Sequence, residues 1–386
     1  MTIESIRPGL PDTKAGSTPL RGKLRTVEMG RGIAAIAVVM FHANGAAIDL
    51  GLSYTRWASP LQFGVDFFFV LSGFIIFYIH SPDIGHRRKA GLFAFKRVAR
   101  LYPVLWFVAG GWIAANIVFG GTPTLSQIGT SLLLYPSTTE PLPTPVWTLR
   151  HEALFYLAFG VAIVSRRAGL VIGAVWGSAI VMQVGLVLAG RPIEGVMGMV
   201  LSSYGLDFLM GAGVAYFVRN RRLDSWWPFV IGLVLVIVCA VLFVEHGLQR
   251  DGTNDYTSFN TLMIPFVGAS FAVLLYGMLC IEHRLKVPEW AVFLGSASYA
   301  IYLVHTPING VIFRIAKDIG DGYLQLLLLL GGIFGGIAVH LLFERPVAKM
   351  LRCFAPNQAK GLWSAAASIT RPGSTPSFGP KGYRKD

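Results

Sequence analysis

An arginine and a histidine lie within one apolar stretch near the start of the chain, and their spacing places them on a common helix face. Arg31 and His42 are 11 residues apart, which is close to three full turns of an α-helix and about 16 Å along its axis. A histidine has an ordinary pKa of about 6.5, is largely neutral at cellular pH and can act as a general base. His42 is therefore a candidate base, although a structural histidine is an equally good interpretation of this residue alone.

A second group of candidate residues is basic. The segment 86–103 reads HRRKAGLFAFKRVARLYP and is expected to form a loop between two membrane spans. Arg97 and Arg100 are three residues apart, with Lys96 beside them. Because guanidinium groups present fixed forks of donors to phosphate oxygens, these arginines are candidates for binding a phosphate-containing ligand. Ordinary positive charge on the cytoplasmic side, or contact with lipid headgroups, is the stronger interpretation of the segment as a whole.

Polar residues also lie at the beginning of the apolar stretch that starts near residue 147. Its outer end carries Arg150, His151 and Glu152, and Tyr156 follows Glu152 by one helical turn on the same face. A carboxylate near His42 can orient and charge-stabilise the imidazole, and Arg150 can pair with Glu152 or hold an acidic substrate. The alternative is a structural ion pair that closes the outer loop.

Two further polar groups lie near the end of the chain. Ser298, Tyr302 and His305 are spaced i, i+4 and i+7 and form a polar stripe along an otherwise apolar helix. Glu344 and Arg345 end the final apolar stretch, where a structural pair at the membrane boundary is the stronger interpretation.

The composition defines the environment of these residues. The chain has 386 residues, of which 54% are hydrophobic and 14% charged, and its mean hydropathy is +0.58. With Gly counted in place of Tyr, about 62% of residues are apolar, against about 45–50% in a soluble domain. These values exclude a soluble enzyme, a disordered protein and a disulfide scaffold. Since an ionisable side chain in a membrane span costs about 2.5–3.5 kcal/mol, each one is a functional candidate.

The apolar runs predict an all-α, polytopic transmembrane helix bundle. Crossing a bilayer takes about 20 residues per helix, and ten runs approach that length. We expect spans at about 30–48, 62–80, 102–119, 147–164, 168–189, 197–218, 228–245, 259–281, 290–312 and 322–343. The three cysteines lie far apart and have neither metal-ligand nor redox spacing.

Basic residues set the predicted orientation. With the N-terminus in the cytoplasm, 27 of the 33 Lys and Arg residues fall in cytoplasmic segments, as the positive-inside rule requires. This distribution accounts for the net charge of +13 without a nucleic-acid partner. Both termini are then cytoplasmic: a short segment 1–23 precedes the membrane domain 24–353, and residues 354–386 form a Ser-, Pro-, Gly- and Lys-rich tail that we expect to be disordered.

Taken in order, these motifs resemble acyltransferase family 3, integral membrane O-acetyltransferases of bacteria that modify exported carbohydrates. Any one block is weak, but six in order over residues 24–350 form a specific pattern. The matching blocks are Arg31 with His42, Gly64–Phe69 with Ser72–Phe74, Lys96–Arg97 with Arg100–Pro103, Trp147–Leu149 with Glu152 and Phe155–Tyr156, Ser298–Tyr299 with Tyr302–Leu303 and His305, and Glu344–Pro346.

The resemblance implies a transmembrane acyltransferase domain in the bacterial inner membrane, with acetyl-CoA as the acyl donor and a carbohydrate hydroxyl as the acceptor. Within the family, this sequence resembles the short form, which lacks a fused extracytoplasmic esterase-like domain. That form is most similar to exopolysaccharide O-acetyltransferases. The resemblance also implies that His42 is essential and that Arg31 and the Arg97–Arg100 region handle acyl-CoA. The expected residues for binding acyl-CoA or substrate are Arg31, Arg97, Arg100, Tyr102, Trp147, Arg150, Tyr156, Ser298, Tyr302 and His305.

These observations combine into one mechanistic hypothesis. The thioester reaches into the bundle, and His42, supported by Glu152, deprotonates the acceptor hydroxyl for attack. A covalent acyl-enzyme stays open as an alternative. The competing function is a proton-coupled carbohydrate transporter or flippase in which His42, Glu152 and His305 form a relay. No bound cofactor or metal is expected, membrane lipids surround the bundle, and a homo-oligomer is left open.

Overall fold

The computed structural model describes residues 24–49, 56–220, 224–246, 263–316 and 321–353, and all regular structure in these ranges is helical. The predicted cytoplasmic segment 1–23 and the predicted disordered tail 354–386 lie outside the described residues. The α-helices are α1 (Arg25–Asp49), α2 (Gly64–His80), α3 (Ala90–Val118), α4 (Leu125–Leu133), α5 (Val146–Val164), α6 (Arg166–Leu188), α7 (Gly195–Val200), α8 (Tyr204–Asn220), α9 (Trp227–Glu245), α10 (Met263–Cys280), α11 (Glu289–Ala316), α12 (Asp321–Val339) and α13 (Arg345–Cys353).

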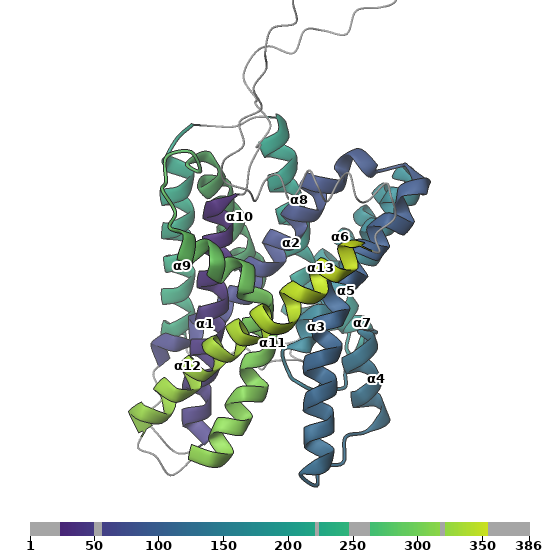
Figure 1. Ribbon diagram of the computed structural model, residues 1–386. Helices are drawn as coiled ribbons and strands as arrows, with labels where there is room; N and C mark the ends of the chain where they lie inside the picture. Colours follow the sequence, from purple (N-terminus) through teal and green to yellow (C-terminus); the bar gives the residue numbers. More distant parts are fainter. Residues whose placement is uncertain (1–23, 50–55, 221–223, 247–262, 317–320, 354–386) are drawn as a thin grey trace, which may run out of the picture.

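Short helical turns connect some of these elements. The 3₁₀ turns Arg56–Phe63 and Ser81–Asp83 flank α2, a third turn (Arg87–Lys89) precedes α3, and the π-helical turn His340–Glu344 joins α12 to α13. Figure 1 shows that α12, the π turn and α13 run obliquely across the front of the bundle. π-helical turns are rare and often lie at functional sites.

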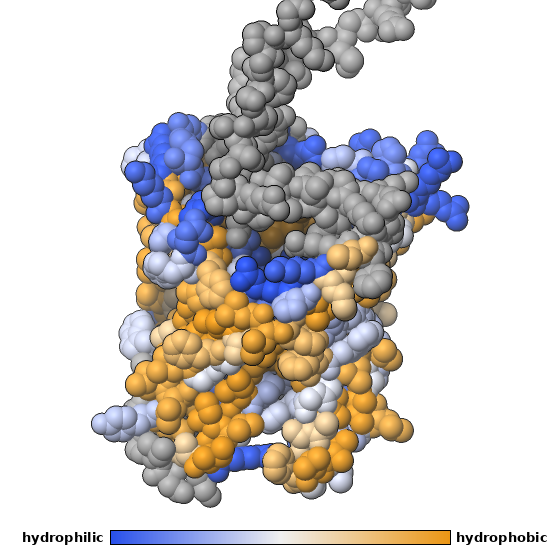
Figure 2. Space-filling view, in the orientation of Figure 1, coloured by the Kyte–Doolittle hydropathy of each residue, from blue (hydrophilic) through white to orange (hydrophobic). Residues whose placement is uncertain are grey.

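The all-helical membrane fold is confirmed. In the described ranges, nine helical segments are long and apolar enough to cross a membrane. Within the described residues each of the ten predicted spans is largely helical, and α5, which covers the fourth, is not among those nine. Figure 2 shows apolar side chains in a broad band around the middle of this face, with hydrophilic side chains gathered at the upper end. This distribution is the one that a multi-pass membrane protein requires.

One prediction about an individual segment was wrong. The basic stretch after the second span is mostly helix rather than loop, because α3 begins at Ala90. Its apolar residues Phe93 and Leu101 are buried against the bundle, which stabilises the extra turns. The sixth predicted span is kept as one membrane-length segment, Gly195–Arg219, with a short break where α7 ends at Val200 and α8 begins at Tyr204.

Close helix contacts determine which polar stripes meet. A side chain at Gly295 of α11 would overlap the Glu28 carbonyl oxygen of α1, and one at Gly73 of α2 would overlap the Phe208 carbonyl of α8. Small residues at such crossings let transmembrane helices approach closely. The α1–α11 crossing therefore turns the helix face of Arg31 and His42 towards α11, the helix of the Ser298–His305 stripe.

Candidate active site

A cavity of about 80 Å³ lies where α1, α2, α3, α5 and α11 meet. Its apolar lining comes largely from α2, and its polar lining from all five helices. The polar residues are Arg31, Ser72, Arg100, Thr148, Glu152, Ser298, Tyr299 and Tyr302. Arg31 and Arg100 follow the first residues of α1 and α3 by six and ten positions, which places them roughly 9 and 15 Å along those helices.

The two cavity arginines differ in their partners. Arg31 forms an ion pair of 3.4 Å with Glu28, one turn earlier in α1. Arg100 is exposed to the cavity, and the described part of the chain shows no hydrogen bond or ion pair for it. Arg100 interacts electrostatically with Tyr156 and Glu152, and more weakly with Glu344 in the π turn, which also acts on Arg31. Arg100 is thus the guanidinium most available to an oxygen-rich ligand.

Glu152 belongs to this cavity. Its Oε1 accepts a hydrogen bond of 3.3 Å from the Ser72 hydroxyl and another from the Tyr156 hydroxyl. The start of α5 is buried, with Thr148 and Arg150 5% and 2% exposed. Protein contacts, not lipid, therefore surround the polar residues of α5, which explains how a helix with this composition stays inside the bundle.

Arg97 has a different environment from Arg100, although sequence analysis grouped the two. Its guanidinium lies over the rings of Phe93 and Tyr156, with its central carbon 5.5 and 5.6 Å from the ring centroids. Its Nη2 atom is 3.1 Å from Nε2 of His80. Arg97 is not part of the cavity lining, and its contacts are those of a cation held by aromatic rings.

The two histidines of the predicted site form a pair deeper in the bundle. The ring centroids of His42 and His305 are 5.0 Å apart. His305 is fully buried, and neither of its ring nitrogens has a hydrogen-bond partner among the described residues, whereas His42 is half-buried. His305 follows Ser298 by seven residues on α11, which puts the histidine pair about 10 Å beyond the Ser298 level of the cavity.

The predicted pairing of His42 with Glu152 has no recorded contact in the described ranges. The ring contacts of His42 are with Phe41 and His305, and the hydrogen bonds of Glu152 are with Ser72 and Tyr156. Tyr302 connects the two levels, because it lines the cavity and its ring centroid is 5.9 Å from that of His305.

Three other predicted site residues lie in the walls rather than in the cavity lining. Trp147 is buried with its ring against Phe69, and Tyr102 donates to the Leu133 carbonyl at the end of α4. Arg150 donates to the carbonyl oxygens of Ser137 and Thr139 at 2.5 and 2.7 Å. These bonds tie the loop before α5 to the helix, which is a structural role for Arg150.

Some polar residues were not predicted as site residues. Ser72 belongs to a matching family block but was not among the expected binding residues, and it lines the cavity. His80 and Asp83, outside the cavity lining, were not singled out and lie where α2 ends. Glu344, predicted to be a structural end-cap, is held by a 2.6 Å contact with His340 and acts on the cavity arginines. Within the described residues, no three His, Cys, Asp or Glu side chains are grouped as metal ligands.

Comparison with known proteins identifies the family. A family model described as "Acyltransferase domain" (Acyl_transf_3) matches residues 25–345. The chain is 28% identical over 81% of its length to the exopolysaccharide production protein ExoZ of Rhizobium meliloti and covers 95% of that protein. It is 25% identical over 82% of its length to YrhL of Bacillus subtilis and 24% identical over 72% to the peptidoglycan O-acetyltransferase OatA of Listeria monocytogenes.

The extent of these matches differs. The chain spans about half the length of YrhL and OatA, 54% and 48% respectively, but nearly all of ExoZ. No solved structure gives a significant match. The family match covers all the helices that line the cavity as well as both histidines. The chain therefore belongs to acyltransferase family 3, and it is a membrane-embedded O-acyltransferase.

Proposed function

We propose that this enzyme transfers an acetyl group from acetyl-CoA to a hydroxyl of an exported or cell-surface carbohydrate, with an exopolysaccharide as the preferred acceptor class. The observation that carries the proposal is the arrangement of α1. Arg31 faces a cavity that also holds Arg100, and His42 lies on the same helix, deeper in the bundle and beside His305. Likeness to ExoZ over nearly its whole length supports the acceptor class.

Arg100 and Arg31 are the groups that we expect to contact the donor. A guanidinium offers only hydrogen-bond donors and favours phosphate, carboxylate and carbonyl oxygens. A coenzyme A that enters from the cytoplasmic side meets these two cations before it meets the histidines. The thioester lies at the end of a flexible pantetheine arm, which can extend over the remaining distance of about 10 Å between the Ser298 and His305 levels of α11.

His42 is the proposed general base. It takes the proton from the acceptor hydroxyl as that oxygen attacks the thioester carbonyl. The carbon–sulfur bond then breaks, the imidazolium gives the same proton to the departing sulfur, and CoA leaves as the thiol. Positioned base catalysis contributes about 10²–10⁴-fold to the rate. Glu152 is retained in the proposal as a residue of the donor cavity, where it orients Ser72 and Tyr156 rather than the imidazole.

The proposed location is the bacterial inner membrane, with both chain ends in the cytoplasm. In this orientation the first turns of α1, α3 and α11 start from the cytoplasmic side. Arg31 and Arg100 are then close to the cytoplasmic supply of acetyl-CoA, and His42 is closer to the outer leaflet. The partners are acetyl-CoA, the carbohydrate acceptor and membrane lipids.

The test is the O-acetyl content of surface and secreted polysaccharide, measured by proton NMR. The strains are a deletion strain and the same strain with wild-type protein or His42→Ala at matched expression. Acetyl signals restored by the wild type alone support the acetyltransferase and its base. Unchanged acetylation with lost polysaccharide export contradicts the proposal and favours the transporter.

A further inference from the structure

The turn that follows α2 places a histidine and an aspartate beside Arg97. We propose that His80 and Asp83 are positioning residues that hold Arg97 against Tyr156 and thereby keep Glu152 facing the cavity. This inference rests on the proposed function, because it gives the pair a role in acetyl transfer. Neither residue contacts the cavity itself, so the pair acts through Arg97.

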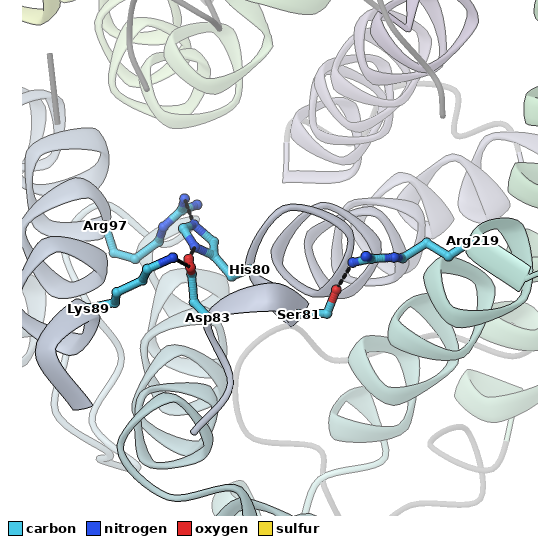
Figure 3. A network of polar contacts seen from close by, with 6 residues as sticks. All are labelled: His80, Ser81, Asp83, Lys89, Arg97 and Arg219. Carbon is cyan, nitrogen blue, oxygen red and sulfur yellow. Dashed lines mark hydrogen bonds and ion pairs between the residues drawn. The ribbon is translucent and has the colours of Figure 1, made fainter. Parts of the chain in front are cut away.

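Three polar contacts connect the pair to its surroundings. Nδ1 of His80 is 2.8 Å from Oδ2 of Asp83, and Nε2 of His80 is 3.1 Å from Nη2 of Arg97. Lys89 holds the other carboxylate oxygen of Asp83 at 2.5 Å. Figure 3 shows these four side chains converging from the end of α2 and the start of α3. His80 is only 3% exposed, so its ring orientation is fixed by packing as well as by these bonds.

The chemistry of the three groups fixes the state of the imidazole. A guanidinium can only donate and a carboxylate can only accept. His80 must therefore carry its proton on Nδ1, donate it to Asp83 and accept from Arg97 through the lone pair of Nε2. The same logic governs histidines whose second nitrogen is oriented by a carboxylate. Asp83 thus sets the tautomer that makes His80 an acceptor for Arg97.

Arg97 connects the His80–Asp83 pair to residues of the cavity wall. With one nitrogen on His80, its guanidinium is held over the ring of Tyr156 at 5.6 Å. The Tyr156 hydroxyl donates to Oε1 of Glu152, and the same carboxylate oxygen accepts from Ser72 in the cavity. Loss of the His80 acceptor frees Arg97 to leave the ring, and Tyr156 and Glu152 then lose their fixed placement.

A matched control lies one residue away. Ser81 accepts a hydrogen bond from Arg219 of α8, and Figure 3 shows this pair on the other side of α2 from Arg97. Ser81→Ala removes a polar contact from the same turn without touching the His80–Asp83–Arg97 group. The informative variants are His80→Ala, which deletes the acceptor, and His80→Gln, whose amide oxygen can replace it.

The experiment measures acetyl transfer by purified full-length variants in proteoliposomes, with labelled acetyl-CoA and acceptor oligosaccharide. We expect His80→Ala to lower kcat about 10- to 100-fold, the range set by losing a hydrogen bond to a charged group. KM for acetyl-CoA should change less than about threefold, because Arg97 is not expected to bind the donor directly. His80→Gln should recover at least part of kcat, and Ser81→Ala should match the wild type.

Three results overturn the inference: wild-type kcat in His80→Ala, no recovery in His80→Gln, or an increased KM at unchanged kcat. The ¹⁵N spectrum of the histidine rings provides a second readout that needs no turnover. We expect the Nδ1-protonated form for His80, and a shift of its Nε2 signal in Arg97→Leu. A preparation whose wild type transfers no acetyl group refutes the proposed function. In that case the ¹⁵N spectra still decide whether His80 positions Arg97.

Discussion

Replacing His42 by Ala tests the assignment of the base most directly. The substitution removes a half-buried ring whose recorded contacts are with Phe41 and His305. Arg31 is 11 residues away on the same helix, about 16 Å along the axis. We therefore expect kcat to fall by about 10²–10⁴-fold, the contribution of a positioned general base, while KM for acetyl-CoA stays near its wild-type value because the donor contacts remain.

The assay is acetyl transfer from labelled acetyl-CoA to acceptor oligosaccharide by purified protein in proteoliposomes. His246→Ala is the matched control, since His246 is an exposed histidine at the end of α9 whose ring contacts the Leu242 carbonyl of the same helix at 2.9 Å. Thermal unfolding of both variants in detergent should resemble that of the wild type. The ring of His42 is not fully buried, so its loss leaves no large enclosed cavity.

Two outcomes would refute this reasoning. If His42→Ala retains a third or more of wild-type kcat, the imidazole is not the base. If kcat stays constant and KM for acetyl-CoA rises instead, then His42 binds the donor rather than activating the acceptor. A lowered melting temperature in His42→Ala alone would trace the loss of activity to the α1–α11 interface.

Three further predictions concern the cavity and the helix crossing beside it. Arg100→Gln should raise KM for acetyl-CoA by roughly 10- to 100-fold, since a hydrogen bond to a charged group contributes about 1.5–3 kcal/mol; steady-state kinetics measure this change, and an unaltered KM would contradict it. Glu152→Gln should lower kcat less than His42→Ala does, because Glu152 orients neighbours and does not contact the histidines; equal losses would restore it as the partner of His42. Gly295→Val should lower the melting temperature in detergent, because a side chain there overlaps the Glu28 carbonyl. Overpacking of this kind typically costs about 1–3 kcal/mol. An unchanged melting temperature would argue against the close crossing of α1 and α11.

Which residues share a face of one helix was predictable from the sequence. Which residues of different helices contact each other was only partly predictable. The 11-residue spacing put Arg31 and His42 on one helix face, because the helical period alone fixes this. The partner of His42 could not be derived in the same way. Nothing in the local pattern indicates that α11, not α5, brings the nearest polar side chain, since that depends on where Gly295 permits close approach.

Spacing was misleading where tertiary contacts divide neighbouring residues. Arg97 and Arg100 share a sequence motif, but one lies over aromatic rings and the other opens into the cavity. The residue that separates their roles, His80, comes from another helix and carries no motif of its own. Likewise, Arg150 looked like a partner for Glu152, whereas the loop before α5 supplies the carbonyl oxygens that it binds.

The arrangement of α1 against α11 has a consequence for the proposed reaction. Each helix carries polar side chains to the cavity and one histidine to the deeper pair: Arg31 and His42 from α1, and Ser298, Tyr299, Tyr302 and His305 from α11. The separation of the cavity level from the histidine level is then set by residue number along two packed helices, not by flexible side chains. A rigid separation of this kind favours a donor whose reactive carbon lies at the end of a long arm, with its charged groups held at one level and its thioester delivered to the other. It disfavours a small, compact acyl donor, which could not contact Arg100 and reach His42 at the same time.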